Sequence, residues 1–303
     1  MTDRREFIKN STLLGSSLMM NKIGLKPQTT ERMNNVNLII LATNWGYPGS
    51  LESFCAAAKK EGYDGIEVWV PGTEKEMNEL KKTTDNFHLK LGLLVGGSDK
   101  NPEKHKEQFM SSLERAIKMN PIYINCHSGK DFFEFNANAE ILNSSIKRSK
   151  ESGIPVYHET HRGRSLFAAH ITHNFIKEIP DLRLTLDISH WCNVHESLLQ
   201  DQPQHVDAAL SRTDHIHARI GHAEGPQVND PRAPEWEQTL DTHLRWWDAI
   251  VERKTKEGKP VTILTEFGPP SYLPTLPYTN QQVADQWAIN VFMMKMLKKR
   301  YSK

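Results

Sequence analysis

Short apolar runs alternate with longer amphipathic stretches along most of the chain from Asn37 onward. Short apolar runs are typical of buried strands, whereas apolar residues at every third or fourth position are typical of helices that cover a sheet. The pattern predicts eight strands: Leu38–Thr43, Gly65–Val70, Leu89–Val95, Ile122–His127, Pro155–Glu159, Leu184–Asp187, His215–Arg219 and Val261–Glu266.

Each predicted strand is followed by a predicted helix. The helical stretches are Ser50–Glu61, Thr73–Thr84, Pro102–Met119, Ala137–Ser152, Ser165–Glu178, His205–Ser211, Glu235–Glu257 and Asn280–Lys299. Ser50 has the side chain of an N-cap, and a glycine follows three of the helices at the position where a left-handed C-cap needs one. Those glycines are Gly62, Gly153 and Gly258.

Alternation of strands and helices predicts a parallel sheet with right-handed crossovers. The units within residues 36–303 match a (β/α)8 barrel, which typically has about 250 residues. An open doubly wound sheet is the alternative, but it usually has a Gly-x-Gly-x-x-Gly turn after its first strand. The turn here, Thr43–Pro48, offers no such phosphate cradle. The sequence therefore predicts a single-domain TIM barrel.

Residues 1–30 are predicted to be an export signal and not part of the fold. Arg4 and Arg5 precede a Phe-Ile-Lys sequence, and the modestly apolar residues 11–20 follow. This order resembles a twin-arginine signal peptide, whose pathway exports proteins that are already folded. We therefore expect a periplasmic or otherwise exported protein. A cytoplasmic protein is expected if the segment is only a basic N-terminus.

Charge and composition narrow the class of partner. Lys plus Arg total 38 and Asp plus Glu total 37, so the formal net charge is +1, and such a chain has no general field to attract nucleic acid. No apolar run approaches the roughly 18 residues of a membrane span. The three cysteines are odd in number and far apart, which implies no disulfide framework. We expect a small-molecule partner, with no nucleic acid and no membrane span; a homo-oligomer remains open.

Residues that can bind metal or transfer protons are concentrated in one part of the sequence, because 11 of the 14 histidines lie between His127 and His222. The carboxyl ends of barrel strands converge on one site. Four residues that can bind a cation lie at equivalent heights on the last four predicted strands: Glu159, Asp187, His217 and Glu266.

Three carboxylates and an imidazole do not converge without a cation, because the carboxylates repel one another. A single acid at a strand end is commonly only a hydrogen-bonding residue, but four such residues on successive strands favour a metal site. Mixed oxygen and nitrogen ligands suit Mn²⁺, Co²⁺, Zn²⁺ or Mg²⁺. We expect one divalent metal ion bound by Glu159, Asp187, His217 and Glu266. His215 is expected one layer lower on the same strand, and His158 is expected to point away from the site.

The Glu, Asp-x-x-His, His-x-Arg, Glu series resembles the xylose-isomerase-like sugar isomerase and epimerase barrels. The resemblance extends over residues 37–300 and includes Glu67 in the second strand. In that family the four residues hold a catalytic metal, and the glutamates of the fifth and eighth strands are acid and base. The resemblance implies that Glu159 and Glu266 are catalytic and act through a metal-bound enediolate.

Further residues are expected to contact substrate. The resemblance implies this role for His190 in the Asp-x-x-His motif and for Arg219 in the His-x-Arg motif. We expect His127, His161 and Glu67 to face the same pocket, with His127 as an additional ligand if the site holds more than one metal. The proline-rich, aromatic segment at 269–278 is a candidate for stacking on a sugar ring.

The predicted function is a metal-dependent sugar isomerase or epimerase that acts on a sugar or sugar derivative. The same site could instead eliminate across a keto-sugar or keto-glycoside as a lyase. A third hypothesis is a non-catalytic, metal-stabilised sugar-binding protein. An apurinic-endonuclease-like hydrolase is less favoured, because the third strand ends Val95-Gly96-Gly97-Ser98 without the histidine that such enzymes need.

Overall fold

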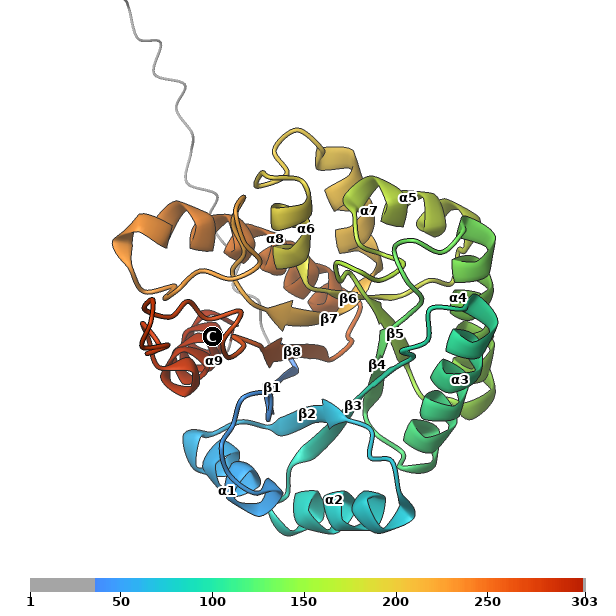
Figure 1. Ribbon diagram of the computed structural model, residues 1–303, viewed down its shortest axis with the longest axis horizontal. Helices are drawn as coiled ribbons and strands as arrows, with labels where there is room; N and C mark the ends of the chain where they lie inside the picture. Colours follow the sequence, from blue (N-terminus) through green and yellow to red (C-terminus); the bar gives the residue numbers. More distant parts are fainter. Residues whose placement is uncertain (1–35, 302–303) are drawn as a thin grey trace, which may run out of the picture. The chain divides into compact units, whose positions relative to one another are not determined.

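A closed barrel of eight parallel strands, in the order β1 to β8, forms the centre of the structure, with the helices around it (Figure 1). The structure is a computed structural model that describes residues 36–301. The strands are β1 (Leu38–Thr43), β2 (Gly65–Trp69), β3 (Lys90–Gly96), β4 (Tyr123–His127), β5 (Val156–Glu159), β6 (Leu184–Leu186), β7 (Thr213–Ala218) and β8 (Val261–Thr265). The predicted TIM barrel is confirmed, and the predicted signal at 1–30 lies outside the described residues.

The helices connect successive strands on the outside of the barrel. They are α1 (Leu51–Glu61), α2 (Glu74–Asn86), α3 (Pro102–Lys118), α4 (Phe135–Ser152), α5 (Ala169–Glu178), α6 (Ile188–Val194), α7 (Pro203–Arg212), α8 (Glu237–Lys256) and α9 (Gln286–Tyr301). A short 3-10 helix, η1 (Pro234–Trp236), precedes α8.

Helix ends follow the predicted local signals. Ser50 Oγ accepts a hydrogen bond from Ser53 N at 3.2 Å and caps α1. Gly62, Gly153 and Gly258 all have positive φ, at 97°, 74° and 66°. A residue with a side chain would be strained in this left-handed conformation, which explains glycine at the end of each helix.

Residues along β1 alternate between two apolar layers. Ile40 and Ala42 point outward into the core between the barrel and its helices, while Ile39 and Leu41 belong to a second cluster inside the barrel. Leu41 and Leu264 are register partners where β1 pairs with β8 and closes the ring. The interior cluster also includes Tyr123 from β4 and fills the barrel below the polar residues described next.

Two parts of the predicted element pattern need correction. The segment after β6 forms the short helix α6, which was not predicted, and Asp187 is its N-cap and not the last residue of a strand. The final helix begins at Gln286 and not at Asn280, since the preceding segment is an irregular proline-rich connection.

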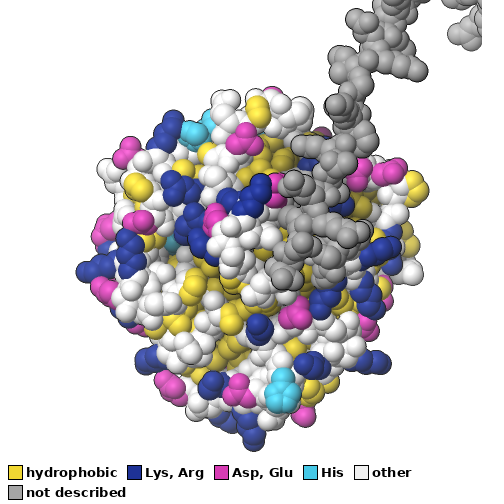
Figure 2. Space-filling model, turned by 180° about the vertical axis from the view of Figure 1, so that it is seen from behind, with side chains coloured by type: hydrophobic (Ala, Val, Ile, Leu, Met, Phe, Trp, Pro, Cys, Tyr) yellow, Lys and Arg dark blue, Asp and Glu magenta, His cyan; other side chains and the backbone are white. Residues whose placement is uncertain are grey.

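Surface features agree with the balanced composition. Acidic and basic side chains are interspersed over the face shown in Figure 2. The three cysteines are buried and free. Between residues 36 and 301, none of the helices combines the length and the apolar character needed to cross a membrane.

Candidate metal and acid–base site

Four side chains converge at the carboxyl ends of the last four strands. Glu159 ends β5, Asp187 follows β6, His217 lies in β7 and Glu266 follows β8. One ligand atom from each lies within 4.8 Å of the others. The first three side chains are buried, whereas the side chain of Glu266 is 12% exposed. The structure thus brings the four predicted metal ligands together.

The donor set fits a divalent cation. Nδ1 of His217 lies 3.0 Å from Oε2 of Glu266 and 3.7 Å from Oε2 of Glu159. Oε1 of Glu159 is buried and has no hydrogen-bond partner among the described residues. A buried carboxylate oxygen without a partner is unfavourable. A cation among these oxygen and nitrogen atoms would satisfy it.

Burial and neighbouring charges shift the pKa values of three residues of the cluster. Burial raises the pKa of Asp187 to about 6, and the neighbouring Glu266 and Glu159 add to this effect while Arg219 opposes it. Burial also opposes ionisation of Glu159, but the imidazoles of His127 and His217 hold its pKa well below the usual range. His217 is buried as well, yet the surrounding carboxylates raise its pKa well above that of a free histidine.

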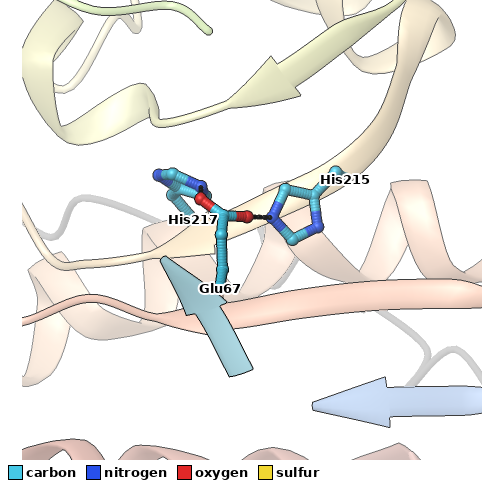
Figure 3. Close-up of side chains that lie close together, drawn as sticks. All are labelled: Glu67, His215 and His217. Atoms are coloured by element: carbon cyan, nitrogen blue, oxygen red, sulfur yellow. Dashed lines mark ion pairs between the residues drawn. The ribbon is translucent and has the colours of Figure 1, made fainter. Parts of the chain in front are cut away.

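Glu67 forms the floor of the cluster, between two histidines of β7 (Figure 3). Its Oε1 lies 3.2 Å from Nε2 of His217, and its Oε2 lies 3.1 Å from Nε2 of His215. The hydroxyl of Tyr123 donates to the same Oε2 at 2.7 Å. Because Nε2 of His217 is held from below, its Nδ1 faces the carboxylates above.

Glu67, expected among the substrate contacts, lies below the cluster inside the barrel. The Glu67 side chain is 2% exposed, and both of its oxygens are already engaged inside the barrel. Glu67 therefore holds Nε2 of His217 from below, and His215, which was expected one layer lower, contacts the other oxygen of Glu67. Its pKa is lowered despite burial, because His217 and His215 favour the ionised carboxylate.

Asn125 is a site residue that the sequence analysis missed. Its Nδ2 donates to Oε2 of Glu159 at 2.7 Å. Tyr123, Asn125 and His127 are every second residue of β4, so their side chains share the face of the strand that points into the barrel. The position of Asn125 two residues before His127 was the signal in the sequence that could have identified it as a site residue.

Arg219 and His190 lie on the β6–β7 side of the cluster. A terminal nitrogen of Arg219 contacts Oδ2 of Asp187 and lies 2.8 Å from Nε2 of His190. The same nitrogen is 3.6 Å from Oε2 of Glu266. The guanidinium also lies over the ring of Tyr272, 4.8 Å from its centroid, so the aromatic segment after β8 covers this side of the site.

His127 and His161 extend the site toward β4 and β5. Nε2 of His127 is 3.0 Å from Oε2 of Glu159, and the rings of His127 and His161 are 4.7 Å apart. The ring of His161 is in turn 3.9 Å from that of His190. Burial lowers the pKa of both His161 and His190 well below the usual value, so these two are neutral hydrogen-bonding groups.

His158 lies outside the site, as predicted. Its Nδ1 is 2.6 Å from Oγ of Ser128 and its Nε2 is 3.2 Å from Oγ of Ser145. Burial lowers the pKa of His158 to about 3, which makes it a neutral, hydrogen-bonded core histidine.

The model of the xylose isomerase-like TIM barrel family matches residues 55–244. No curated protein matches the chain. Among solved structures, 3-keto-D-glucoside 4-epimerase YcjR from E. coli in its apo form has a TM-score of 0.59 and 14% identity, covering 88% of this chain and 100% of that one.

Two further structures, of proteins with different names, have the same fold. The probable 3-DHS dehydratase AsbF from Bacillus anthracis has a TM-score of 0.56 and 17% identity, over 86% of this chain and 99% of that one. A xylose isomerase-like TIM barrel protein from Mycobacterium smegmatis in complex with magnesium has a TM-score of 0.56 and 9% identity, over 86% and 97%. Sugar 3-epimerases and endonucleases are among the other matches. At such identities the likeness shows the fold alone, so the site must decide the chemistry.

Proposed function

The chain belongs to the xylose isomerase-like TIM barrel family, and from this premise we propose that it is a divalent-metal-dependent sugar isomerase or epimerase. One observation carries the proposal: the carboxylates of Glu159 and Glu266 both lie beside Nδ1 of His217, at 3.7 and 3.0 Å. Two carboxylates in one buried site can move a proton to and from the same substrate carbon. Sugar epimerases among the structural neighbours support an enzyme of this kind.

The metal would be held by Glu159, Asp187, His217 and Glu266, the set whose donor atoms cluster. When bound, a divalent cation would stabilise the negative charge that develops on the substrate oxygens. Glu67 and Asn125 support this set from the protein side. Glu67 fixes the ring of His217, and Asn125 donates to Glu159 and fixes its orientation.

Glu159 and Glu266 are the proposed acid and base. One carboxylate takes the proton from the carbon next to the carbonyl, and the electron pair left behind makes the substrate an enediolate. Return of a proton to the opposite face of that carbon gives the epimer. Return of a proton to the former carbonyl carbon gives the isomer, as the hydroxyl proton of the first carbon passes to the former carbonyl oxygen. Glu159 suits the role of base because its neighbours hold it ionised.

Arg219, His190 and His161 are proposed to position the substrate. Arg219 is a buried cation 3.6 Å from Glu266, where it can attract a substrate oxygen. The two imidazoles are neutral and line the same side, so they can exchange hydrogen bonds with sugar hydroxyls.

The test is proton exchange in D₂O with a panel of ketoses, aldoses and keto-glycosides. The proposal expects deuterium on the carbon next to the carbonyl. Glu159→Gln and Glu266→Gln should each lower turnover by at least the ~10² typical of lost general acid–base catalysis. Metal content is measured on the same samples, since both residues are also proposed ligands. Glu79→Gln, an exposed residue on α2, is the matched control and should retain full turnover.

The outcome also separates the alternatives. A lyase would release an unsaturated product, and a binding protein would show affinity without product. Sugar isomerisation without any deuterium label would contradict proton transfer by the two glutamates. An apurinic endonuclease is disfavoured by β3, which ends at Gly96 beside His127 and Trp69 without a histidine of its own.

Export is a separate proposal that rests on residues 1–30, with Arg4 and Arg5 as its recognition element. Replacing both arginines by lysine keeps the charge but should leave the precursor in the cytoplasm. Fractionation of cells that express the wild type and this variant checks it. Equal export of the two proteins would contradict the twin-arginine signal.

A further inference from the structure

A cavity of about 500 Å³ lies beside the candidate site, at the carboxyl ends of β2 and β3. Trp69 and residues 96–98 form one side of it, and α3 forms the other with Gln108, Ser111, Ser112 and Arg115. The segments after β4 and β5 contribute Lys130 and Arg164. Among the described residues, the lining includes three cationic side chains and no acidic one.

The three cations of this cavity have no ion-pair partner within the described part of the chain. Arg115 donates only to neutral acceptors, which are the carbonyl oxygens of Pro71 and Ser111 and the hydroxyls of Ser111 and Ser112. Nε of Arg164 is buried without a hydrogen-bond partner in the described residues.

Nearby carboxylates attract two of these cations but do not pair with them. Asp131 attracts both Arg164 and Lys130, and Glu159 attracts Arg164, but no carboxylate of the described chain forms an ion pair with either cation. Burial lowers the pKa of Lys130, and the charge of Arg164 lowers it further. A half-buried group of like charges is unfavourable unless an anion joins it.

The cavity and the candidate site share a wall. Trp69 is 52% exposed, lines the cavity, and lies edge-on to the ring of His127 with centroids 5.3 Å apart. His127 reaches Glu159 on its other side, at 3.0 Å. A ligand that extends from Glu159 past His127 would therefore reach the cavity over the exposed ring of Trp69. An exposed indole ring can stack on a sugar.

From this arrangement we infer that the substrate is a carbohydrate with an anionic group, a carboxylate or a phosphate, on the part remote from the reacting carbonyl. Lys130, Arg164 and Arg115 hold that group, while Trp69 packs against the sugar between it and Glu159. The inference rests on the proposed isomerase or epimerase function for the reacting end. Arginine suits either anion because its fork of donors matches carboxylate and phosphate oxygens.

Binding of three matched sugars to the full-length protein tests this inference independently of turnover. D-Glucose is the neutral probe, D-glucuronate carries a carboxylate, and D-glucose 6-phosphate carries a phosphate. Titration calorimetry at low salt should give at least roughly tenfold tighter binding for one or both acidic sugars. The preference should shrink at high salt, because salt screens exposed charges. The tighter of the two acidic sugars identifies the anion.

Substitutions of the cavity cations test whether the preference for acidic sugars arises in this cavity. Lys130→Gln and Arg164→Gln should each reduce the affinity for the acidic sugar by roughly tenfold and leave that for glucose unchanged. Lys104→Gln on the exposed first turn of α3 is the matched control and should retain the preference. Equal affinities for the three sugars, absence of binding, or a preference that survives in both cavity variants would overturn the inference.

The two proposals fail in different ways. If acidic sugars bind through Lys130 and Arg164 but no sugar of the panel exchanges a proton, the function proposed above is wrong and the anion site stands. If neutral sugars turn over and the charge of the probe makes no difference, the function stands and the anion site is wrong.

Discussion

Asp214 and Asp187 lie at opposite ends of the barrel and have opposite electrostatic surroundings. Asp214 is near the start of β7, where Nε of Arg183 donates to it at 2.7 Å and Nζ of Lys254 at 3.2 Å. Asp187 follows β6 at the other end and shares its surroundings with Glu159 and Glu266. Burial disfavours the charge of both carboxylates, but only at Asp214 do the neighbouring cations overcome it.

The pKa values of the two residues express this difference. That of Asp214 is lowered, because hydrogen bonds from Arg183 and the charge of Lys254 outweigh the effect of burial. That of Asp187 is raised to about 6 even though Arg219 contacts it. One end of the barrel satisfies its own charges and contributes to stability. The other end brings several carboxylates together around His217 and Arg219, at the end of the strands where a TIM barrel has its active site, and this set could hold a cation.

Of the changes considered, metal removal should have the largest effect on activity and stability, and it should act at the end of the barrel that holds Asp187. Chelation is expected to abolish activity and to lower the melting temperature, since the freed carboxylates at the β5–β8 end would then repel one another. Elemental analysis, turnover and thermal unfolding before and after chelation check this. Full activity in chelator, in protein that contains no metal above background, would contradict the metal site.

Asp214→Asn should be the most destabilising single substitution in this comparison. It leaves Arg183 and the buried Lys254 without their carboxylate, which typically costs roughly 3 kcal/mol of unfolding free energy for a buried pair. Urea unfolding measures the loss, and turnover of the folded variant should stay at the wild-type level. Asp241→Asn, at an exposed position of α8, is the control and should change stability little.

Asp187→Asn should give the opposite combination. Removing one carboxylate from a crowded, buried set relieves repulsion from Glu159 and Glu266, and this gain offsets the lost contact with the buried Arg219. The metal-free variant is therefore expected to be within about 1 kcal/mol of the metal-free wild type. Metal binding and turnover should both be lost. Unfolding of the two metal-free proteins, together with elemental analysis, checks this. A metal-free variant destabilised as much as Asp214→Asn would contradict this comparison, because the carboxylate of Asp187 would then stabilise the fold as that of Asp214 does.

Much of the barrel could be predicted from the sequence because its signals are local. The strand Leu38–Thr43 has the same bounds in prediction and structure, since its apolar run is flanked by polar residues. Helix α6 was missed because its seven residues follow directly on a strand and are buried on most sides, so that no helical period is visible. The start of α9 was placed too early because the apolar residues of the preceding connection resemble a helical stretch.

Site residues could be predicted as far as they depend on strand ends. The convergence of Glu159, Asp187, His217 and Glu266 follows from the equivalence of those ends in a barrel. The position of Glu67 could not be predicted, because the histidines that hold it stand far along the chain in β7. Trp69 and the cationic cavity likewise depend on the packing of α3 against the loops after β4 and β5, which no local pattern specifies.

The smallest effect concerns the pH dependence of the stability that Asp214 contributes. Its pKa is lower in the folded protein than in the unfolded chain, where a free aspartate titrates near 3.9. The unfolded chain therefore binds the proton first as pH falls, and the contribution decreases from the unfolded pKa down to the folded one. Above about pH 5 the contribution is complete, so wild type and Asp214→Asn should differ in unfolding free energy by a constant amount there. Below about pH 4 the difference should shrink, because protonation removes from the wild type the charge that the variant already lacks. Urea unfolding of both proteins from pH 3 to pH 7 measures this difference directly, and a difference that stays constant down to pH 3 would contradict the ion pairs with Arg183 and Lys254 as its origin.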